Sequence, residues 1–177
     1  MMKFAHCPHC GSPTVSRALG GRPREFCAGC NRPYFHNPIA AAAAVILDGG
    51  RILLCHRNSS VFRGRWSIPA GFCEEDETIE ACAVREAKEE VGLDVEIVGL
   101  IDANSGFEVA GRPVVGVYFR VEPKGGLIEP GDDVDGAEFF PLAAVPDLPF
   151  AGDRRVVEIL RTGRYPYQDV ALPPETR

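Results

Sequence analysis

The sequence predicts a mixed α/β protein, of the α+β type in its segment order, with a small cysteine-rich module ahead of the main domain. Two observations support this fold class. Apolar runs of strand length occur together with helix patterns in residues 37–165, and two close cysteine pairs precede residue 31. A chain of 177 residues, 45% of them hydrophobic, has room for one ordinary domain plus an appendage. We therefore expect a module at residues 1–36, a main domain at 37–165 and a tail at 166–177.

The module carries two C-x2-C motifs, Cys7 with Cys10 and Cys27 with Cys30, separated by sixteen residues. This spacing is typical of a zinc site with four thiolate ligands, because each tight turn supplies two sulfurs and two turns complete a tetrahedron. A pair of disulfides is the alternative, but seven cysteines leave an odd thiol. We expect structural Zn²⁺ in a small β zinc ribbon, since about thirty residues bury too little apolar surface to fold unaided.

The main domain is expected to begin with a hairpin. The apolar run Ile39 to Leu47 predicts a buried strand, Asp48-Gly49-Gly50 predicts a tight turn, and Arg51 to Arg57 predicts the partner strand. Residues 31–38, with Pro33 and Pro38, are interpreted as the linker that precedes it.

Further elements follow the hairpin along the chain. Strands are expected at residues 94–103, 113–121 and 137–142, with an acidic, glycine-rich loop at 125–136. A closing helix is expected at 153–161, capped by Gly152 or Asp153 and stopped at Gly163.

The segment from Gly71 to Leu93 is the most informative part of the chain. Its helical part places Glu86, Glu89 and Glu90 within an arc of roughly 100°, since a helix turns by about that angle per residue. The other side carries a small apolar stripe, so we expect one side of the helix to face the core and the acidic side to face solvent. The stripe consists of Val84, Ala87 and Val91.

A divalent cation would relieve the repulsion among these three carboxylates. Hard oxygen ligands suit Mg²⁺ first and Mn²⁺ second, and the helix has no Cys or His cluster. The alternative is a solvated acidic face on which Arg85 and Lys88 are ordinary surface charges. The acidic loop before the helix and the stop at Gly92 favour the metal site, because loop, helix and helix end are all specified.

The segment also matches G-x5-E-x7-R-E-U-x-E-E-x-G-U, where U is aliphatic, and so resembles the Nudix box of the Nudix hydrolases. The resemblance implies an α/β/α sandwich with a mixed sheet, and a loop-helix-loop that holds Mg²⁺ or Mn²⁺. It assigns the catalytic metal to Gly71, Glu86, Glu89 and Glu90, and it implies a supporting ion pair between Arg85 and Glu77 in the catalytic group.

The reaction implied by the resemblance is hydrolysis of the diphosphate link in a nucleoside diphosphate derivative, giving a nucleoside monophosphate. The general base is either a box carboxylate, Glu89 or Glu90, or a carboxylate on a later loop. The later candidates are Glu122, Glu129, Asp132, Asp133, Asp135 and Glu138.

The order of cysteine motifs, Tyr34-Phe35-His36-Asn37-Pro38 and the box resembles the zinc-ribbon Nudix proteins from about Cys7 to Arg161. That group includes ADP-ribose and FAD pyrophosphatases and, more distantly, NADH pyrophosphatases. The NADH enzymes usually carry S-Q-P-W-P-F-P-x-S after the box, whereas this chain has residues 103–108 there, A-N-S-G-F-E. Glu108 also replaces the proline of one ADP-ribose subgroup.

Substrate contacts can be proposed from side-chain chemistry, since a diphosphate suits a guanidinium fork and a base suits an aromatic face. Arginines near the box and its preceding strand are the phosphate candidates: Arg57, Arg63 and Arg65. Aromatic residues beside predicted strands are the stacking candidates, although such residues more often belong to the core: Phe35, Phe62 and Trp66.

Charge and hydropathy bound the partners and the location. A net charge of −6 argues against sequence-independent binding of nucleic acid, so a small nucleotide substrate is expected. The longest apolar run is far shorter than the roughly twenty residues that cross a bilayer, which indicates no membrane partner and a cytoplasmic protein. A homodimer is compatible with the resemblance, but no sequence feature specifies an interface.

Two other functions remain open at this point. One is a non-catalytic Nudix-like regulator that senses a nucleotide, which missing box carboxylates would favour, and none is missing. The other is a zinc-ribbon adaptor or an RNA-cap-directed Nudix protein, for which the ribbon offers Arg17, Arg22, Arg24 and Arg32.

Overall fold

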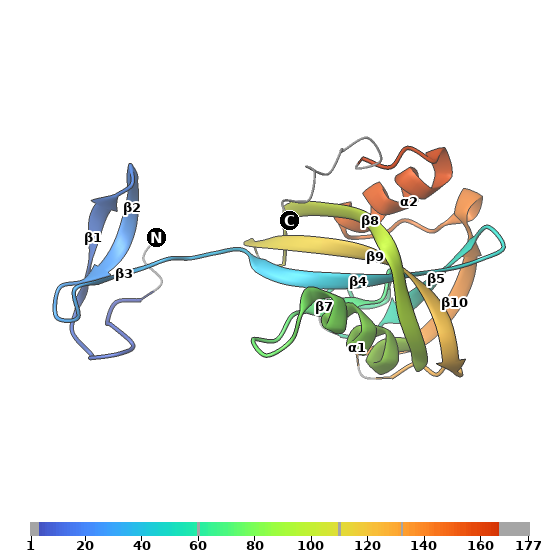
Figure 1. Ribbon diagram of the computed structural model, residues 1–177, viewed down its shortest axis with the longest axis horizontal. Helices are drawn as coiled ribbons and strands as arrows, with labels where there is room; N and C mark the ends of the chain where they lie inside the picture. Colours follow the sequence, from blue (N-terminus) through green and yellow to red (C-terminus); the bar gives the residue numbers. More distant parts are fainter. Residues whose placement is uncertain (1–3, 60, 110, 132, 167–177) are drawn as a thin grey trace, which may run out of the picture. The chain divides into compact units, whose positions relative to one another are not determined.

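The computed structural model describes residues 4–59, 61–109, 111–131 and 133–166, and for residues 107–109 it describes the backbone alone. The chain divides into two compact units, Met1–Asn37 and Pro38–Arg177, each with its own sheet (Figure 1). The expected tail lies outside the described residues from position 167 onward.

The first unit is a three-stranded antiparallel sheet in the order β1-β2-β3. Its strands are β1 (Thr14–Leu19), β2 (Arg22–Cys27) and β3 (Arg32–Tyr34). The expected linker is therefore wrong in its first part, because β3 pairs with β2 from Glu25↔Tyr34 to Cys27↔Arg32. Proline did not prevent this pairing, since an edge strand leaves one side of its backbone without a partner strand.

The second unit is built on one mixed sheet in the order β10-β5-β4-β9-β8, with β6 paired to β5 and β7 paired to β4. Strands β4 and β9 run parallel, from Ile39↔Val114 to Ile46↔Val121, and the other pairs are antiparallel. Its elements are β4 (Ile39–Asp48), β5 (Arg51–Arg57), β6 (Trp66–Ser67), β7 (Ala70–Phe72), α1 (Ile79–Val91), β8 (Leu93–Val109), β9 (Arg112–Gly126), β10 (Val134–Pro141), a 3-10 turn (Leu142–Ala144) and α2 (Ala151–Thr162).

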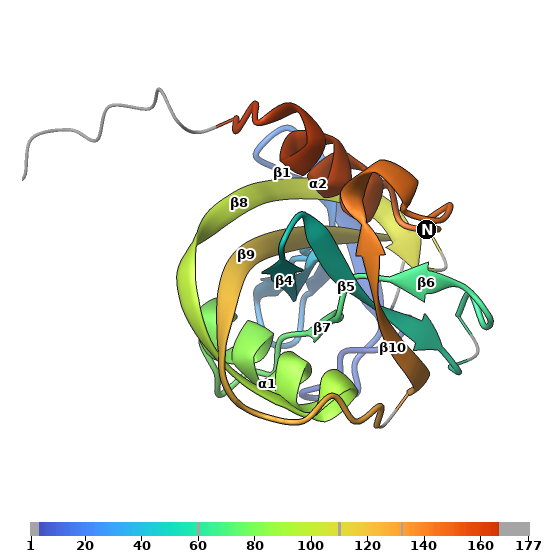
Figure 2. The same cartoon turned by 90° about the vertical axis from the view of Figure 1, so that its right-hand side faces the viewer.

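Strand β4 is buried on both faces, which explains its uninterrupted apolar run. Because side chains alternate along a strand, Ala42, Ala44 and Ile46 pack in the cluster that includes α1. Ala43 and Val45 pack in the cluster that includes α2. Figures 1 and 2 show the two helices on opposite sides of the sheet. The expected α/β/α sandwich with a mixed sheet is confirmed.

Strands β8 and β9 are longer than the sequence predicts. They pair along most of their length, with four register shifts, two of which leave Val98 and Ile101 without an opposite residue. Likewise the expected acidic loop is shorter, because β9 extends to Gly126 and β10 begins at Val134.

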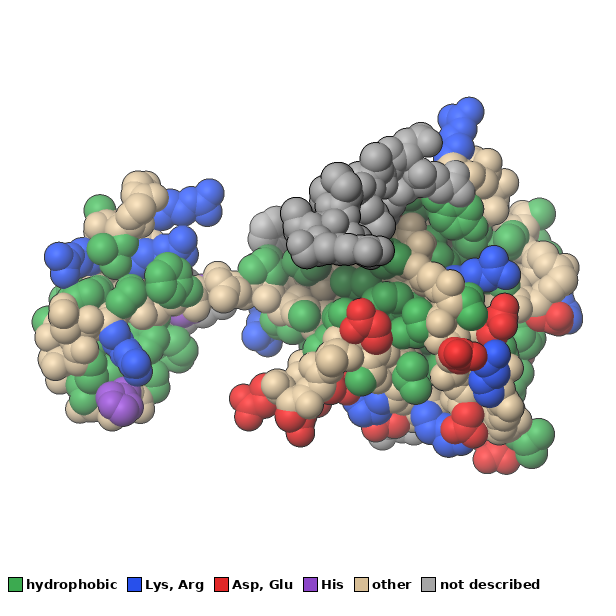
Figure 3. All heavy atoms as spheres, in the orientation of Figure 1, with side chains coloured by type: hydrophobic (Ala, Val, Ile, Leu, Met, Phe, Trp, Pro, Cys, Tyr) green, Lys and Arg blue, Asp and Glu red, His purple; other side chains and the backbone are tan. Residues whose placement is uncertain are grey.

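Helix α2 begins at Ala151 after Phe150, which gives no side-chain cap, so the predicted cap at Gly152 or Asp153 is wrong. The predicted stop at Gly163 is confirmed. The described helices include none with the length and apolar character to cross a bilayer. On the face of the second unit seen in Figure 3, acidic and basic side chains are intermixed.

Candidate active site

The helix α1 is fixed at both ends by its own sequence. Thr78 is the N-cap, and its hydroxyl accepts a hydrogen bond from the Ala81 amide at 3.1 Å. Gly92 ends the helix in the left-handed conformation, with φ of 75°, where a side chain would be strained. These two residues set the register that determines where each carboxylate of the helix points.

The expectation of a solvent-facing acidic side is wrong for two of the three carboxylates. Glu86 and Glu90 are buried, with 9% and 5% of their surface exposed, and only Glu89 is exposed. The helix lies close to the sheet because Ala83 and Ala87 are small and fully buried. As a result, the carboxylates of Glu86 and Glu90 lie buried between the helix and the segment around β7.

Glu90 reaches the backbone of the preceding segment. Its Oε2 accepts a hydrogen bond from the Ala70 amide at 2.9 Å and lies 3.6 Å from the Cys55 sulfur. Burial raises the pKa of Glu90 to about 7, and burial also raises the pKa of Glu86. Both carboxyls are therefore placed where a nearby cation would favour their charged form.

Gly71 forms a cradle for the Glu86 carboxylate. A Cβ at position 71 would lie 2.0 Å from Glu86 Oε1 and 2.2 Å from its Cδ, closer than real contacts allow. The residue must be glycine for this close approach. Gly71 and the two buried carboxylates line one cavity, and carbonyl and carboxylate oxygens are the donors that Mg²⁺ and Mn²⁺ accept, so the types of donor fit the metal.

A single guanidinium holds the helix and the loop before it together. Arg85 pairs with Glu77 at 2.6 Å, with Glu86 at 2.7 Å and with Glu89 at 2.8 Å. The same side chain donates to the carbonyl of Phe72 at 3.1 Å. Its hydrogen bonds lower the pKa of Glu77 to about 2. The Arg85–Glu77 ion pair that the resemblance implies is present.

These groups border a cavity of about 660 Å³ in the second unit. This volume falls within the roughly 300–1,000 Å³ of small-molecule sites. The cavity wall brings together the box and distant segments of the chain. It includes Arg57, Ser59, Gly71, Arg85, Glu86, Glu89, Glu90, Asn104, Tyr118, Asp133, Phe150 and Asp153.

Of the three arginine candidates, Arg57 alone is among the described wall residues. Its guanidinium carbon lies 5.3 Å from the centre of the Phe150 ring, and it donates to Ser59 Oγ at 2.9 Å. Arg65 instead pairs with Asp147 at 2.6 Å, and Arg63 donates to the Asn58 carbonyl.

None of the three aromatic candidates is among the described wall residues. Trp66 packs against His56 and Phe140, with ring centres 5.0 Å and 4.8 Å away, and so has a core role. Phe62 contacts Phe150 edge to face at 5.2 Å. Phe35 belongs to the first unit, where Arg24 stacks on its ring.

Of the later-loop carboxylates that are candidates for the general base, Asp133 alone is among the described wall residues. Four others lie elsewhere in the described part of the chain, and Asp132 lies outside it. The four are Glu122, Glu129, Asp135 and Glu138.

Sequence reasoning missed the wall residues of β9 and α2. Asp153 is 2% exposed, and its carboxylate accepts hydrogen bonds from the Ile68 amide and the Tyr118 hydroxyl, both at 3.0 Å. Phe150 and Asn104 complete this side. The one available signal is an acidic residue in the first turn of an amphipathic helix, a pattern that also predicts a helix cap.

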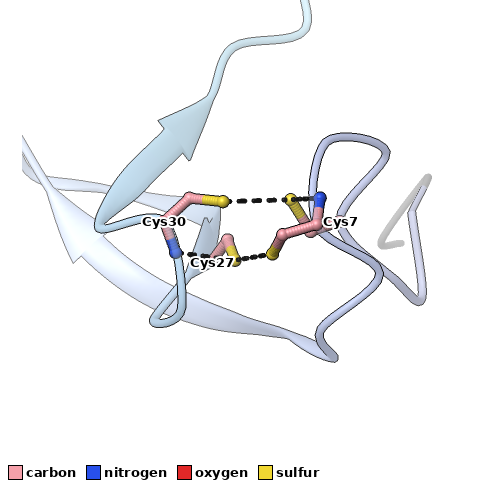
Figure 4. Close-up of side chains that lie close together, drawn as sticks. Cys7, Cys27 and Cys30 are labelled. Atoms are coloured by element: carbon pink, nitrogen blue, oxygen red, sulfur yellow. Dashed lines mark hydrogen bonds between the residues drawn. The ribbon is translucent and has the colours of Figure 1, made fainter.

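The first unit holds a second candidate metal centre. The sulfurs of Cys7, Cys10, Cys27 and Cys30 all lie within 4.8 Å of one another. Figure 4 shows the labelled side chains of Cys7, Cys27 and Cys30 converging. Cys7 and Cys30 are separated by 3.8 Å, and Cys10 and Cys27 by 3.6 Å. Zn–S bonds of about 2.3 Å in a tetrahedron require a sulfur separation of roughly 3.8 Å.

These distances are far longer than the roughly 2.05 Å of a disulfide bond, so the disulfide alternative is wrong. All four cysteines are free. The Tyr34 hydroxyl lies 2.8 Å from the Cys7 sulfur, and this hydrogen bond lowers the pKa of Cys7 to about 6. The neighbouring thiols raise the pKa of Cys30 to about 12, and a bound cation would favour the thiolate form of all four cysteines.

Comparison with known proteins agrees with this geometry. The chain matches the NUDIX domain over residues 36–160. The ADP-ribose pyrophosphatase of Methanocaldococcus jannaschii is 35% identical over 131 residues, which cover 73% of this chain and 77% of that protein. The NAD-capped RNA hydrolase NudC of Stutzerimonas stutzeri is 29% identical over 170 residues, 94% of this chain but 59% of that protein.

A crystal structure of a NUDIX hydrolase from Nitrosomonas europaea superposes with a TM-score of 0.77 at 28% identity, covering 90% of this chain and 93% of that one. The domain match extends over more than half of the chain, and it includes the helix α1 with its buried carboxylates. The chain therefore belongs to the NUDIX family.

Proposed function

We propose that the protein is a Nudix pyrophosphohydrolase that cleaves the diphosphate link of a nucleoside diphosphate derivative, with ADP-ribose or FAD as the first candidates. One observation carries the proposal. The wall of a single cavity presents the acidic face of α1, with Glu86, Glu89 and Glu90, and the guanidinium of Arg57. A bound diphosphate is stabilised by a metal cation on one side and by hydrogen-bond donors on another. The carboxylates of α1 can hold the cation, and Arg57 supplies donors.

Glu86, Glu89, Glu90 and the Gly71 carbonyl would hold Mg²⁺ or Mn²⁺. When bound, such an ion lowers the pKa of a water and neutralises charge on the leaving phosphate. Arg85 keeps Glu86 and Glu89 in fixed positions through its hydrogen bonds. Glu90 is held by the Ala70 amide, so its free oxygen has a defined direction.

The substrate end of the cavity is built from Arg57 and Phe150. Arg57 supplies donors for a phosphate, and the Phe150 ring supplies an apolar face for a base or ring system. The similarity to the M. jannaschii ADP-ribose pyrophosphatase favours ADP-ribose. FAD, NADH and NAD⁺ are the next compounds to compare, the last two because of the similarity to NudC.

The general base is proposed to be Glu89, Glu90 or Asp133, the candidates expected from the sequence that lie in the cavity wall. Glu74, Glu86 and Asp153 are the other wall carboxylates. Glu86 and Glu89 both pair with Arg85, but Glu86 is buried and Glu89 is exposed. Asp153 accepts two hydrogen bonds from protein donors. Activity of Asp133→Asn is compared with that of Asp135→Asn, which removes the same charge from a residue that pairs with His56 and is not among the described wall residues. A loss of activity in Asp133→Asn alone would support Asp133 as the base.

Two further proposals concern the setting of the enzyme. All seven cysteines are free, which supports a reducing compartment, and we place the protein in the cytoplasm. Zn²⁺ in the four-cysteine centre is proposed to be structural, because four thiolates leave no open coordination position. A homodimer remains a prediction.

The test is a substrate panel with Mg²⁺ and Mn²⁺ that follows nucleotide products by chromatography. ADP-ribose, FAD, NADH, NAD⁺ and nucleoside triphosphates are compared with wild-type protein and with Glu90→Gln. Glu80→Gln is the matched control, because Glu80 is an exposed carboxylate in the first turn of the same helix. AMP from one preferred compound, lost in Glu90→Gln and kept in Glu80→Gln, is the expected result. Equal activity of both variants would overturn the assigned site.

A further inference from the structure

The total charge of the chain conceals two units of opposite sign. Residues 1–37 contain five Lys and Arg against one acidic residue, Glu25, which gives a formal charge of +4. The other residues contain fourteen Lys and Arg against twenty-four Asp and Glu, which gives −10. On the side of the first unit visible in Figure 3, basic side chains are seen and acidic ones are not. The total charge of −6 therefore does not exclude nucleic acid binding by this unit.

The strand register gathers the arginines on one face of the small sheet. Arg17 of β1 lies directly opposite Arg24 of β2, and Leu19 lies opposite Arg22. Since side chains alternate along a strand, these residues share a face with Phe26, which lies opposite Val15. We call Arg17, Arg22, Arg24, Phe26 and Phe35 the arginine face.

The acidic residue of the unit lies on the other side of the sheet. Glu25 is 5% exposed, alternates with Arg24 and Phe26, and pairs with His36 at 2.9 Å. No carboxylate among the described residues forms an ion pair with Arg17, Arg22 or Arg24. Like charges directly opposite each other on a sheet are destabilising, and a bound anion would remove that repulsion.

The zinc centre does not cancel this charge locally. Four thiolates and one Zn²⁺ carry a formal charge of about −2. This negative charge lies on the other side of the sheet, because Cys27 alternates with Phe26 along β2 and its side chain points to the face opposite the arginines. Among the described residues of the first unit, the arginine face therefore has three guanidinium groups and no carboxylate.

Aromatic rings lie beside these guanidinium groups. The Arg17 guanidinium carbon is 4.6 Å from the centre of the Phe26 ring, and that of Arg24 is 5.0 Å from the centre of the Phe35 ring. Phe35 is 60% exposed, although apolar rings of this size are normally covered. Phe26 is buried, so Phe35 is the exposed ring of the two, and Arg24 lies beside it. An exposed ring next to basic side chains is the arrangement that binds unpaired bases and the phosphates between them.

We propose that the arginine face binds single-stranded nucleic acid, with a base stacked on Phe35 and phosphates on Arg17, Arg22 and Arg24. A duplex is a poorer match, because its bases are stacked on each other and cannot contact Phe35. This binding is separate from the proposed hydrolysis and does not depend on it.

The test uses the full-length, zinc-loaded protein and fluorescence anisotropy of labelled single-stranded RNA of about 12 nucleotides, within the site sizes of small single-strand-binding modules. No Mg²⁺ or Mn²⁺ is added, so that cleavage does not interfere. The double variant Arg17→Gln/Arg24→Gln is compared with Arg112→Gln/Arg120→Gln. The second pair makes the same charge change at exposed positions of β9, in the other unit. Zinc content is measured for every variant.

The dissociation constant is measured between about 50 and 200 mM salt. Loss of two phosphate contacts should weaken binding and reduce the slope of log K against log salt by about 1.4 in Arg17→Gln/Arg24→Gln. The control pair should keep the wild-type slope. Phe35→Ala should weaken binding at least about fivefold, and a duplex of the same length should bind more weakly.

Several results would overturn the proposal. Wild-type protein that does not bind the strand at the lowest salt excludes it. Equal weakening in both double variants would show attraction by overall charge and not by this face. Duplex binding as tight as single-strand binding, with the affinity of Phe35→Ala unchanged, would also contradict it. A protein that binds an acidic protein, or the acidic unit of a second copy, but no RNA strand would contradict it as well.

Discussion

Gly71→Ala is the substitution whose effect the structure predicts most directly. The new Cβ would lie 2.0 Å from Glu86 Oε1 and 2.5 Å from Oε2. Non-bonded carbon and oxygen atoms need at least about 3.0 Å, so the carboxylate must move by roughly 1 Å or the β7 segment must shift. Gly71 does not adopt a left-handed backbone, so the clash and not backbone strain determines the cost.

Overpacking of this kind costs about 1–3 kcal/mol in free energy of unfolding. The cost should depend on Glu86. In a Glu86→Ala background the carboxylate is gone, and Gly71→Ala should change stability by less than about 0.5 kcal/mol, so the two substitutions are strongly coupled. Gly99→Ala is the control, because a Cβ at Gly99 meets no atom within 4 Å.

Urea unfolding followed by the fluorescence of Trp66, the one tryptophan of the chain, measures these energies in the second unit. Four proteins complete the cycle: wild type, the two single variants and the double variant. The reasoning is refuted if Gly71→Ala costs the same with and without Glu86, because the Glu86 carboxylate would then not occupy the cradle.

Three further outcomes are expected. The pKa of Glu77 is lowered to about 2 by Arg85, so the stability from this pair is fully present above about pH 4.5 and is lost as the pH falls toward 2. The difference between the unfolding midpoints of wild type and Glu77→Gln should therefore shrink as the pH falls from about 4.5 toward 2, and a difference that stays constant over this range would contradict the reasoning. Cys27→Ser should lower zinc below one ion per chain, measured by mass spectrometry, whereas Cys55→Ser, at a buried thiol in the other unit, should keep full zinc. Arg57→Ala should raise KM for the preferred substrate about tenfold or more, as for a lost charged hydrogen bond, while Arg65→Ala, whose guanidinium pairs with Asp147, should leave KM within about twofold; the reverse order would move the phosphate site to Arg65.

Local features of the fold could be predicted from the sequence. The run Ile39 to Leu47 was predicted as a buried strand because a strand covered on both faces is apolar throughout, and it forms β4. Gly92 was predicted to end α1 because a left-handed residue there favours glycine. The two C-x2-C motifs were predicted to converge, since each turn brings its own two sulfurs together.

The depth of the acidic face could not be predicted in the same way. Helical spacing fixes the angles between Glu86, Glu89 and Glu90, but burial depends on how closely the helix approaches the sheet. That distance is set by contacts of Ala83 and Ala87 with residues far away in sequence. An amphipathic pattern therefore gave the correct shared face and the wrong exposure for two of its three members.

Long-range placement explains the errors at the substrate end. Arg65 and Trp66 precede the box closely, but the pairing of β6 with β5 directs Trp66 toward His56 and Phe140. Asp153 and Phe150 reach the cavity from the carboxyl-terminal helix, about eighty residues from Gly71 in sequence. No local pattern around these residues carries that information.

Binding of Mn²⁺ to the zinc-loaded protein, followed by the electron paramagnetic resonance signal of the free ion, tests most directly whether the buried carboxylates of α1 form a metal site. Wild type and Glu80→Gln should bind Mn²⁺ equally, and Glu86→Gln and Glu90→Gln should bind it at least about tenfold more weakly. Unchanged Mn²⁺ affinity in both Glu86→Gln and Glu90→Gln would contradict the assigned site and, with it, the proposed hydrolysis.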